Sequence, residues 1–115
     1  MRGELGDKAR LRHISEAIDK IESFDSDTTE QEFLHDEIKV LACQRLLEII
    51  GEAARCLTAE FKNQHQQIEW RKIIGLRNIM AHQYFEVSDV IIWQVIKIDL
   101  PQLKSEIERA LSALS

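Results

Sequence analysis

The chain has 115 residues, which suits one folded domain better than two, so we expect residues 1–115 to form a single helical domain. Hydrophobic residues make up 44% of the chain and charged residues 30%, a composition that excludes a disordered protein. The formal net charge of −5 argues against a general nucleic-acid coat, because affinity for phosphate comes mostly from Lys and Arg. A local basic site remains compatible with that charge.

Neither a membrane span nor a secretion signal is visible in the sequence. No apolar run approaches the roughly 18 residues that a spanning helix needs, and the N-terminal stretch lacks the apolar core of a signal peptide. Cys43 and Cys56 fall within one predicted helix, about 19 Å apart if it is straight, which is too far for a disulfide. We therefore expect two buried thiols and a cytoplasmic protein without a membrane partner.

The first predicted helix covers residues 7–24. Its apolar residues recur at spacings of three and four, which is typical of one buried helix face. These residues are Leu11, Ile14, Ile18, Ile21 and Phe24. In the polar stretch that follows, Thr29 and Glu32 have the spacing of a capping box, which predicts the start of the next helix.

The second predicted helix is long and covers residues 30–61. Its main apolar stripe consists of Leu34, Ile38, Leu41, Ala42, Leu46, Ile49, Ala53 and Cys56. Leu47, Ile50 and Leu57 widen this stripe. A face this broad usually packs against more than one neighbour, and Gly51 within it predicts a close helix crossing.

A third helix is predicted over residues 68–85, and Ser88 is a candidate N-cap for a fourth. The fourth helix has a sustained apolar stripe. This stripe consists of Trp93, Ile96, Leu100, Leu103, Ile107, Leu111 and Leu114. Pro101 interrupts the pattern, so we expect a kink after Ile98 or Asp99.

The predicted fold is therefore an all-α antiparallel four-helix bundle with a kinked last helix. A second apolar stripe on that helix contains Ile91, Val95 and Ile98 and faces elsewhere. The core of one domain cannot easily bury both stripes, which favours a homodimer.

The stretch LRNIMAHQYF, at positions 76–85, contains the candidate site residues. A helical wheel places Arg77 in the centre of an apolar face that also carries Ile73 and Ile74. A guanidinium is costly to bury unpaired, so Arg77 must meet a carboxylate, a carbonyl or an anionic ligand. A structural ion pair with Glu52 is as good an explanation at this point as a functional site.

Asn78 and His82 lie four residues apart on the flank of the same helix and are neighbours, whereas Tyr84 lies two turns from Arg77. The other histidines are isolated and expected on the surface; they are His13, His35 and His65. No cluster of histidines, cysteines or carboxylates has the spacing of metal ligands, so we expect neither a metal nor another cofactor.

The spacing of Arg77, four residues, His82, one residue and Tyr84 resembles the signature of the HEPN superfamily, and the string IIGLRNIMAHQYFEV resembles its HepT-like branch. The resemblance extends to IIGEAA in the second helix and to the spacing of Trp93, Ile96 and the segment from Asp99 to Leu103. It covers most of the chain from the second helix onward.

This resemblance implies a HEPN-like bundle acting as the toxin of a two-gene toxin–antitoxin module. Such toxins are metal-independent endoribonucleases that form homodimers, and a minimal nucleotidyltransferase silences them by transferring AMP to the motif tyrosine. By this resemblance Arg77 and His82 are catalytic, Asn78 is supportive and Tyr84 is the modification site.

The residue chemistry agrees, because RNA supplies its own nucleophile, the ribose 2′-OH. Cleavage then needs a proton shuttle near neutral pH, such as His82, and a fixed positive charge, such as Arg77. Arg71, Lys72 and Arg77 form a local basic stretch within the acidic chain. Two alternatives remain: a non-catalytic nucleotide-binding or docking partner of the nucleotidyltransferase, and a purely structural dimeric bundle.

Overall fold

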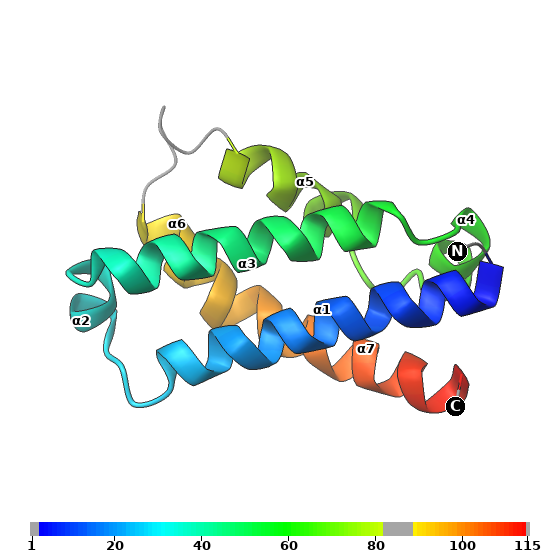
Figure 1. Ribbon diagram of the computed structural model, residues 1–115, viewed down its shortest axis with the longest axis horizontal. Coiled ribbons are helices and arrows are strands. Elements are labelled where there is room, and N and C mark those ends of the chain that lie inside the picture. Colours follow the sequence, from blue (N-terminus) through cyan, green and yellow to red (C-terminus); the bar gives the residue numbers. More distant parts are fainter. Residues whose placement is uncertain (1–2, 82–88, 115) are drawn as a thin grey trace.

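The computed structural model describes residues 3–81 and 89–114, and every regular element within these ranges is helical. The elements are α1 (Gly3–Asp25), α2 (Glu30–Leu34), α3 (Glu37–Arg55), α4 (Ala59–Gln64), α5 (Trp70–Ala81), α6 (Asp89–Gln94), η1 (Val95–Asp99) and α7 (Leu100–Leu114). Figure 1 shows α1, α3, α5 and the continuous α6–η1–α7 segment running alternately in opposite directions. The predicted all-α helical bundle is confirmed.

Helix α1 confirms the first predicted apolar stripe. Leu11, Ile14, Ile18 and Ile21 are fully buried or nearly so. The helix packs mainly against α3 and α7, so this stripe forms one side of the core. After the helix, the Thr29 hydroxyl accepts a hydrogen bond from the Glu32 amide at 3.1 Å, and Glu32 accepts one from the Thr29 amide at 3.0 Å. The predicted capping box is therefore present.

The prediction of one continuous helix over residues 30–61 is wrong, because the chain breaks twice in that range. Asp36 begins α3 by accepting a hydrogen bond from the Lys39 amide at 3.1 Å. Thr58 begins α4 by accepting one from the Phe61 amide, also at 3.1 Å. Each cap satisfies an amide that has no partner inside the helix, so each stabilises a new helix start.

A long-range contact holds the second break in place. The buried carboxylate of Asp7, on α1, accepts hydrogen bonds from the amide and the hydroxyl of Thr58, at 2.9 and 2.7 Å. Both carboxylate oxygens are thereby satisfied, which makes the burial of a charged group tolerable. This contact ties the start of α4 to the start of α1.

The buried face of α3 also differs from the predicted one. Leu47 and Ile50, expected only to widen the main stripe, are fully buried, whereas Ile38 and Leu41 from that stripe are 79% and 55% exposed. The full buried set of this helix is Val40, Cys43, Leu47, Ile50, Gly51, Ala53 and Ala54. Both stripes are apolar, and the positions of α1 and α5 decide which one enters the core.

The two cysteines are free and lie in different environments. Cys43 is fully buried in the core, and this burial raises the pKa of its thiol to about 12. Cys56 is exposed at the C-terminus of α3, so the expectation of two buried thiols is wrong for this residue.

The last predicted helix changes its geometry just before Pro101, as expected. Helix α6 continues into the π-helical turn η1, where the Leu100 amide donates to the Val95 carbonyl five residues earlier. Proline lacks an N–H and cannot bond the carbonyl four residues before it, so a wider turn accommodates its ring. The predicted N-cap Ser88 lies outside the described residues.

In the last predicted core stripe, Ile96, Leu100, Leu103 and Ile107 are buried, whereas Trp93, Leu111 and Leu114 are only partly buried. Ala110, which was not predicted, is also buried. The second stripe is only partly confirmed. Ile91 and Ile98 are 42% and 68% exposed, but Val95 is buried in the core.

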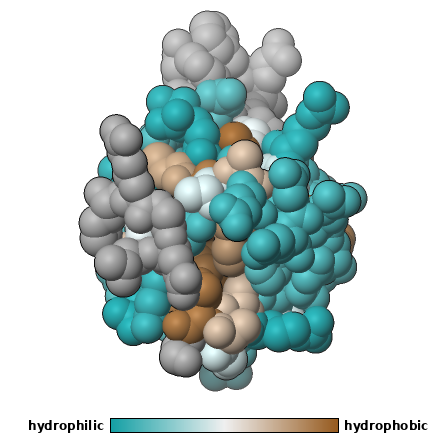
Figure 2. Space-filling model, turned by 90° about the vertical axis from the view of Figure 1, so that its right-hand side faces the viewer, coloured by the Kyte–Doolittle hydropathy of each residue, from teal (hydrophilic) through white to brown (hydrophobic). Residues whose placement is uncertain are grey.

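Figure 2 shows the end of the bundle at which both termini and α4 lie. Hydrophilic side chains cover most of this surface and leave a narrow hydrophobic strip between them. Among the described helices, none combines the length and the hydropathy that a membrane crossing requires.

Candidate active site

Helix α5 carries the described part of the candidate site and is anchored at both its start and its middle. The Trp70 indole donates a hydrogen bond to the His65 carbonyl at 3.0 Å, which fixes the first turn. Ile73 and Leu76 are buried against the core. Arg77 and Asn78 follow directly and are exposed.

The structure corrects the predicted position of Arg77. Leu76 is the buried residue of this turn, whereas the Arg77 side chain is 47% exposed and lies at the edge of the α3–α5 contact. A Cβ added to Gly51 would lie 2.7 Å from the Arg77 backbone nitrogen and 3.1 Å from the Arg77 Cβ. Gly51 therefore permits the close crossing that the sequence predicted, and the Arg77 side chain starts at this crossing and extends to the surface.

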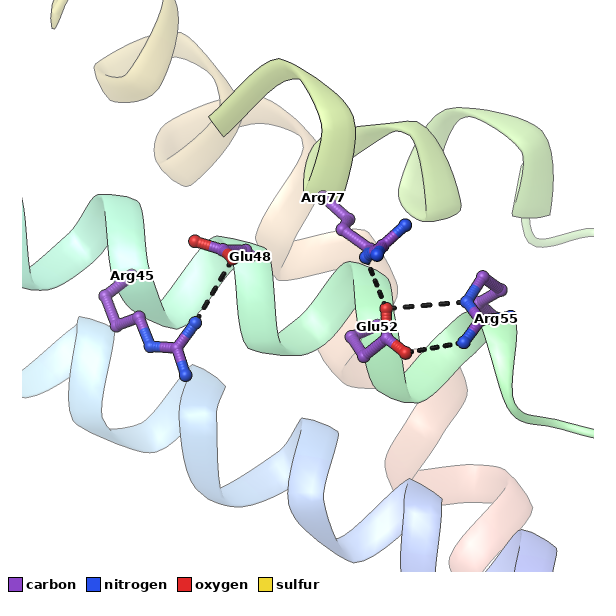
Figure 3. A network of polar contacts seen from close by, with 5 residues as sticks. All are labelled: Arg45, Glu48, Glu52, Arg55 and Arg77. Carbon is purple, nitrogen blue, oxygen red and sulfur yellow. Dashed lines mark hydrogen bonds and ion pairs between the residues drawn. The ribbon is translucent and has the colours of Figure 1, made fainter. Parts of the chain in front are cut away.

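Arg77 forms an ion pair with Glu52, which answers the question of its partner. The Arg77 Nε lies 2.5 Å from Glu52 Oε2, and the Arg55 Nη2 lies 2.7 Å from Glu52 Oε1. In Figure 3, Arg77 extends from α5 toward Glu52, which Arg55 approaches from the other side. Hydrogen bonds from Arg55, followed by the nearby charges of Arg77 and Arg10, lower the pKa of the Glu52 carboxyl.

This ion pair leaves Arg77 able to bind a further anion. The guanidinium has five N–H donors, and the ion pair with Glu52 is made through Nε. Both side chains are more than 40% exposed, so water screens their attraction and the pair is weaker than a buried one. A phosphate can therefore compete with Glu52 for the guanidinium.

A groove of about 520 Å³ lies beside Arg77 and is bounded by α1, α3 and α5. Its lining consists of Arg10, His13, Arg45, Glu48, Ile49, Glu52, Ala53, Cys56 and Arg77. The sequence analysis missed Arg10, His13 and Arg45 as neighbours of Arg77. They lie on helices distant in the sequence, and no spacing pattern indicates that tertiary packing brings them together.

The other predicted residues divide into two groups. Asn78 is exposed next to Arg77, whereas His82 and Tyr84 lie outside the described residues. In the basic stretch, Lys72 donates to Asp99 at 2.8 Å, and this contact raises the pKa of its ammonium group. Lys72 is thus already paired, and Arg71 is exposed to solvent.

The remaining histidines are not all isolated surface residues. His35 is exposed, and its Nδ1 lies 2.7 Å from the Gln31 carbonyl oxygen. His65 stacks on Phe61 with ring centroids 4.2 Å apart, while His13 lines the groove. Within residues 3–81 and 89–114, no three histidine, cysteine or carboxylate side chains form a group that could hold a metal ion.

Comparison with known proteins matches residues 14–110 to the family described as Ribonuclease HepT-like. A Methanocaldococcus jannaschii protein described as a putative RNase is 36% identical over 101 residues, covering 88% of this chain and 93% of the relative. A Thermococcus cleftensis protein described as a probable ribonuclease HepT is 38% identical over 102 residues, covering 89% and 93%. No solved structure matches the chain significantly.

Proposed function

We propose that this chain, which belongs to the ribonuclease HepT-like family, is a metal-independent endoribonuclease and the toxin of a cytoplasmic toxin–antitoxin module. The family match over residues 14–110 carries the proposal, because it includes Arg77 and His82 at the signature spacing. Relatives named as ribonucleases, matched over most of their length, support RNA as the substrate.

The proposed reaction uses the RNA itself as the nucleophile. The 2′-oxygen attacks the adjacent phosphorus, the bond to the 5′-oxygen breaks, and the products are a 2′,3′-cyclic phosphate and a 5′-hydroxyl. His82 takes the proton from the 2′-OH or delivers one to the leaving oxygen. Arg77 stabilises the negative charge that develops on the phosphorane, and Asn78 orients the phosphate or the imidazole.

The half-exposed guanidinium of Arg77 supports this role, because it is accessible from the groove and keeps free donor positions. Two neighbours set its position: Gly51 lies against the Arg77 backbone, and Glu52 forms an ion pair with the guanidinium. Holding a charged group in place before substrate arrives lowers the reorganisation needed in the transition state.

A homodimer is part of the proposal, since it places two motifs near one cleft. Exposed apolar side chains support a second copy: Ile38 and Leu41 on α3, Val90 and Ile91 on α6, and Ile98 on η1. Helices α3 and α6 are in contact, so part of this apolar surface can be continuous. Light scattering at micromolar concentration should give about twice the chain mass of 13.4 kDa.

Cleavage of RNA by the purified protein in EDTA tests the central proposal. We expect activity in chelator, with cyclic phosphate termini on the products. His82→Ala should abolish cleavage while the fold and assembly persist, and Arg77→Lys should fold but be strongly impaired, because lysine lacks the planar fork. Activity that depends on an added divalent ion would refute the metal-independent mechanism.

The alternative is a non-catalytic nucleotide-binding or docking partner of a nucleotidyltransferase. The Arg77–Glu52 pair favours it to some degree, since a guanidinium with a protein partner need not act on RNA. Growth arrest on expression separates the two functions. If the wild type arrests cell growth and the Arg77→Ala, His82→Ala double variant does not, the chain is a toxin. If cells expressing either protein grow equally well, the alternative is supported.

We also propose that the nucleotidyltransferase silences the toxin at Tyr84. The tyrosine oxygen attacks the α-phosphorus of ATP, AMP is transferred and pyrophosphate leaves. The added phosphate gives Arg77 an anion to hold and blocks RNA. Tyr84→Phe should remain an active nuclease that gains no AMP in intact-mass spectra; persistent additions would identify another acceptor.

A further inference from the structure

The groove beside Arg77 extends well beyond the residues of the motif. Arg10 and His13 contribute to it from α1, Arg45 from α3 and Arg77 from α5. The side chains of Ile49 and Ala53 also line it, so the charged groups surround a partly apolar surface. None of the three residues beyond Arg77 takes part in the proposed cleavage chemistry.

The charge of this region is opposite to that of the whole chain. Four arginines and two glutamates lie in or beside the groove, which gives this region an excess of two positive charges. They are Arg10, Arg45, Arg55 and Arg77, with Glu48 and Glu52. The chain as a whole has a net charge of −5. Arg55 and Arg77 both contact the Glu52 carboxylate, and the charge of Arg10 also helps to lower its pKa.

The ion pairs in the groove do not saturate these arginines. Arg45 contacts Glu48 through one nitrogen at 3.2 Å, and its side chain is 67% exposed. Figure 3 shows the Arg45–Glu48 pair and the Glu52 network side by side along α3. Each arginine keeps N–H donors for a further acceptor.

The dimensions suit a chain of phosphates rather than one small anion. Arg45 and Arg55 are ten residues apart, which corresponds to about 15 Å along a helix. This distance is several times the spacing of adjacent phosphates in a nucleic-acid strand, so the arginines can contact more than one phosphate. The apolar lining can contact sugars or bases between these points.

We propose that this groove binds the sugar–phosphate backbone of single-stranded RNA, with Arg10, His13 and Arg45 contacting phosphates outside the scissile bond. The inference rests on the proposed ribonuclease function and extends it to a substrate-binding track. It also accounts for how an acidic protein holds a polyanion, because the binding surface concentrates its positive charge.

The test measures binding of a fluorescein-labelled single-stranded RNA to the full chain carrying His82→Ala, so that cleavage does not interfere. Arg10→Ala with Arg45→Ala should weaken binding about tenfold at 0.1 M salt and make the log–log salt slope shallower by about 1.4, the value for two lost phosphate contacts. Arg45→Ala alone, at a largely exposed position, should shift the slope by about 0.7 without affecting folding.

A matched control removes two arginines outside the groove. Arg12 lies on α1 two residues beyond Arg10 and is exposed, and Arg109 is 72% exposed and paired with Glu106 much as Arg45 is with Glu48. Arg12→Ala with Arg109→Ala should change RNA affinity by less than about twofold, because neither residue lines the groove.

Equal weakening in both double variants, or in neither, would overturn the proposal. It would also be overturned if the groove variant lost self-association or nucleotidyltransferase binding while keeping RNA affinity, since the groove would then be a protein interface. The ribonuclease function is judged separately by cleavage with the wild-type chain. If the groove variant binds RNA more weakly but the wild type does not cleave RNA, the ribonuclease function alone is refuted. If the wild type cleaves RNA and the groove variant binds RNA as tightly as its parent, the groove proposal alone is refuted.

Discussion

The inward face of α3 carries small and apolar residues, among them Leu47, Ile50 and Gly51, which are buried between α1 and α5. The outward face carries Arg45, Glu48, Glu52 and Arg55, all partly or fully exposed and joined in ion pairs. One helix thus holds the fold together on one side and presents the charges of the groove on the other. From this difference we expect stability and the proposed RNA binding to respond to different substitutions, Leu47→Ala on the inward face and Arg45→Ala on the outward face.

The largest effect on stability is expected at Leu47, which is 0% exposed. Leu47→Ala leaves a cavity in the core and should lower the free energy of unfolding by about 2–5 kcal/mol. Arg12, exposed on α1 and outside both the core and the proposed dimer surface, is the control: Arg12→Ala should change it by no more than about 0.5 kcal/mol. Urea unfolding followed by circular dichroism measures both, and equal losses would contradict the assignment of the inner face.

A smaller loss of stability, combined with a loss of activity, is expected at Gly51. Gly51→Ala places a methyl group 2.7 Å from the Arg77 backbone nitrogen, so α5 must shift. Such overpacking should cost about 1–3 kcal/mol and displace Arg77, lowering RNA cleavage more than the loss of folded protein explains.

Gly75 provides the matched control for this substitution. A Cβ there meets nothing within 4 Å, so Gly75→Ala should keep activity and gain up to about 1 kcal/mol from helix propensity. The measurements are the melting temperatures and the initial RNA cleavage rates of the Gly51→Ala and Gly75→Ala variants. An active and stable Gly51→Ala would show that the α3–α5 contact adjusts freely.

Glu52→Gln tests the outward face through the pH dependence of stability. The arginines lower the pKa of Glu52 in the folded state, so the carboxylate stabilises the fold above its ordinary pKa of 4.5. This contribution is lost as the pH falls through the lowered folded-state value. The wild type should thus lose more stability than Glu52→Gln between pH 6 and pH 3.

At neutral pH, Glu52→Gln should also bind RNA a few-fold more tightly, because the groove loses one negative charge. The measurements are urea midpoints across pH and RNA affinity at fixed salt. Parallel pH profiles for the two proteins would indicate that Glu52 is not engaged with the arginines in solution.

The smallest effect on the fold concerns the two thiols. Cys43 is buried with its pKa raised to about 12, whereas Cys56 is exposed. In native protein a thiol reagent should modify Cys56 within minutes and Cys43 only after unfolding, because the thiolate is the reactive form. Rapid modification of both cysteines in native protein would show that the inner face of α3 opens readily.

Most of the fold was predictable, because its signals are local. The stripes on α1 and α7, the Thr29–Glu32 capping box and the change of geometry before Pro101 each depend on residues within a few positions of one another. The breaks at Asp36 and Thr58 also have local capping signals, but the continuous apolar pattern across residues 30–61 outweighed them. Asp7, 51 residues before Thr58, then fixes the second break.

For the candidate site, the motif residues and their spacing could be read directly from the chain, because all of them lie within one short segment. Only the tertiary structure decided that Leu76 enters the core while Arg77 reaches the surface, and that Glu52 holds it. The same packing selected one of two similarly apolar faces of α3 and brought Arg10, His13 and Arg45 into one groove with Arg77. These outcomes depend on close packing between distant segments, where the missing side chain of Gly51 matters as much as any side chain present.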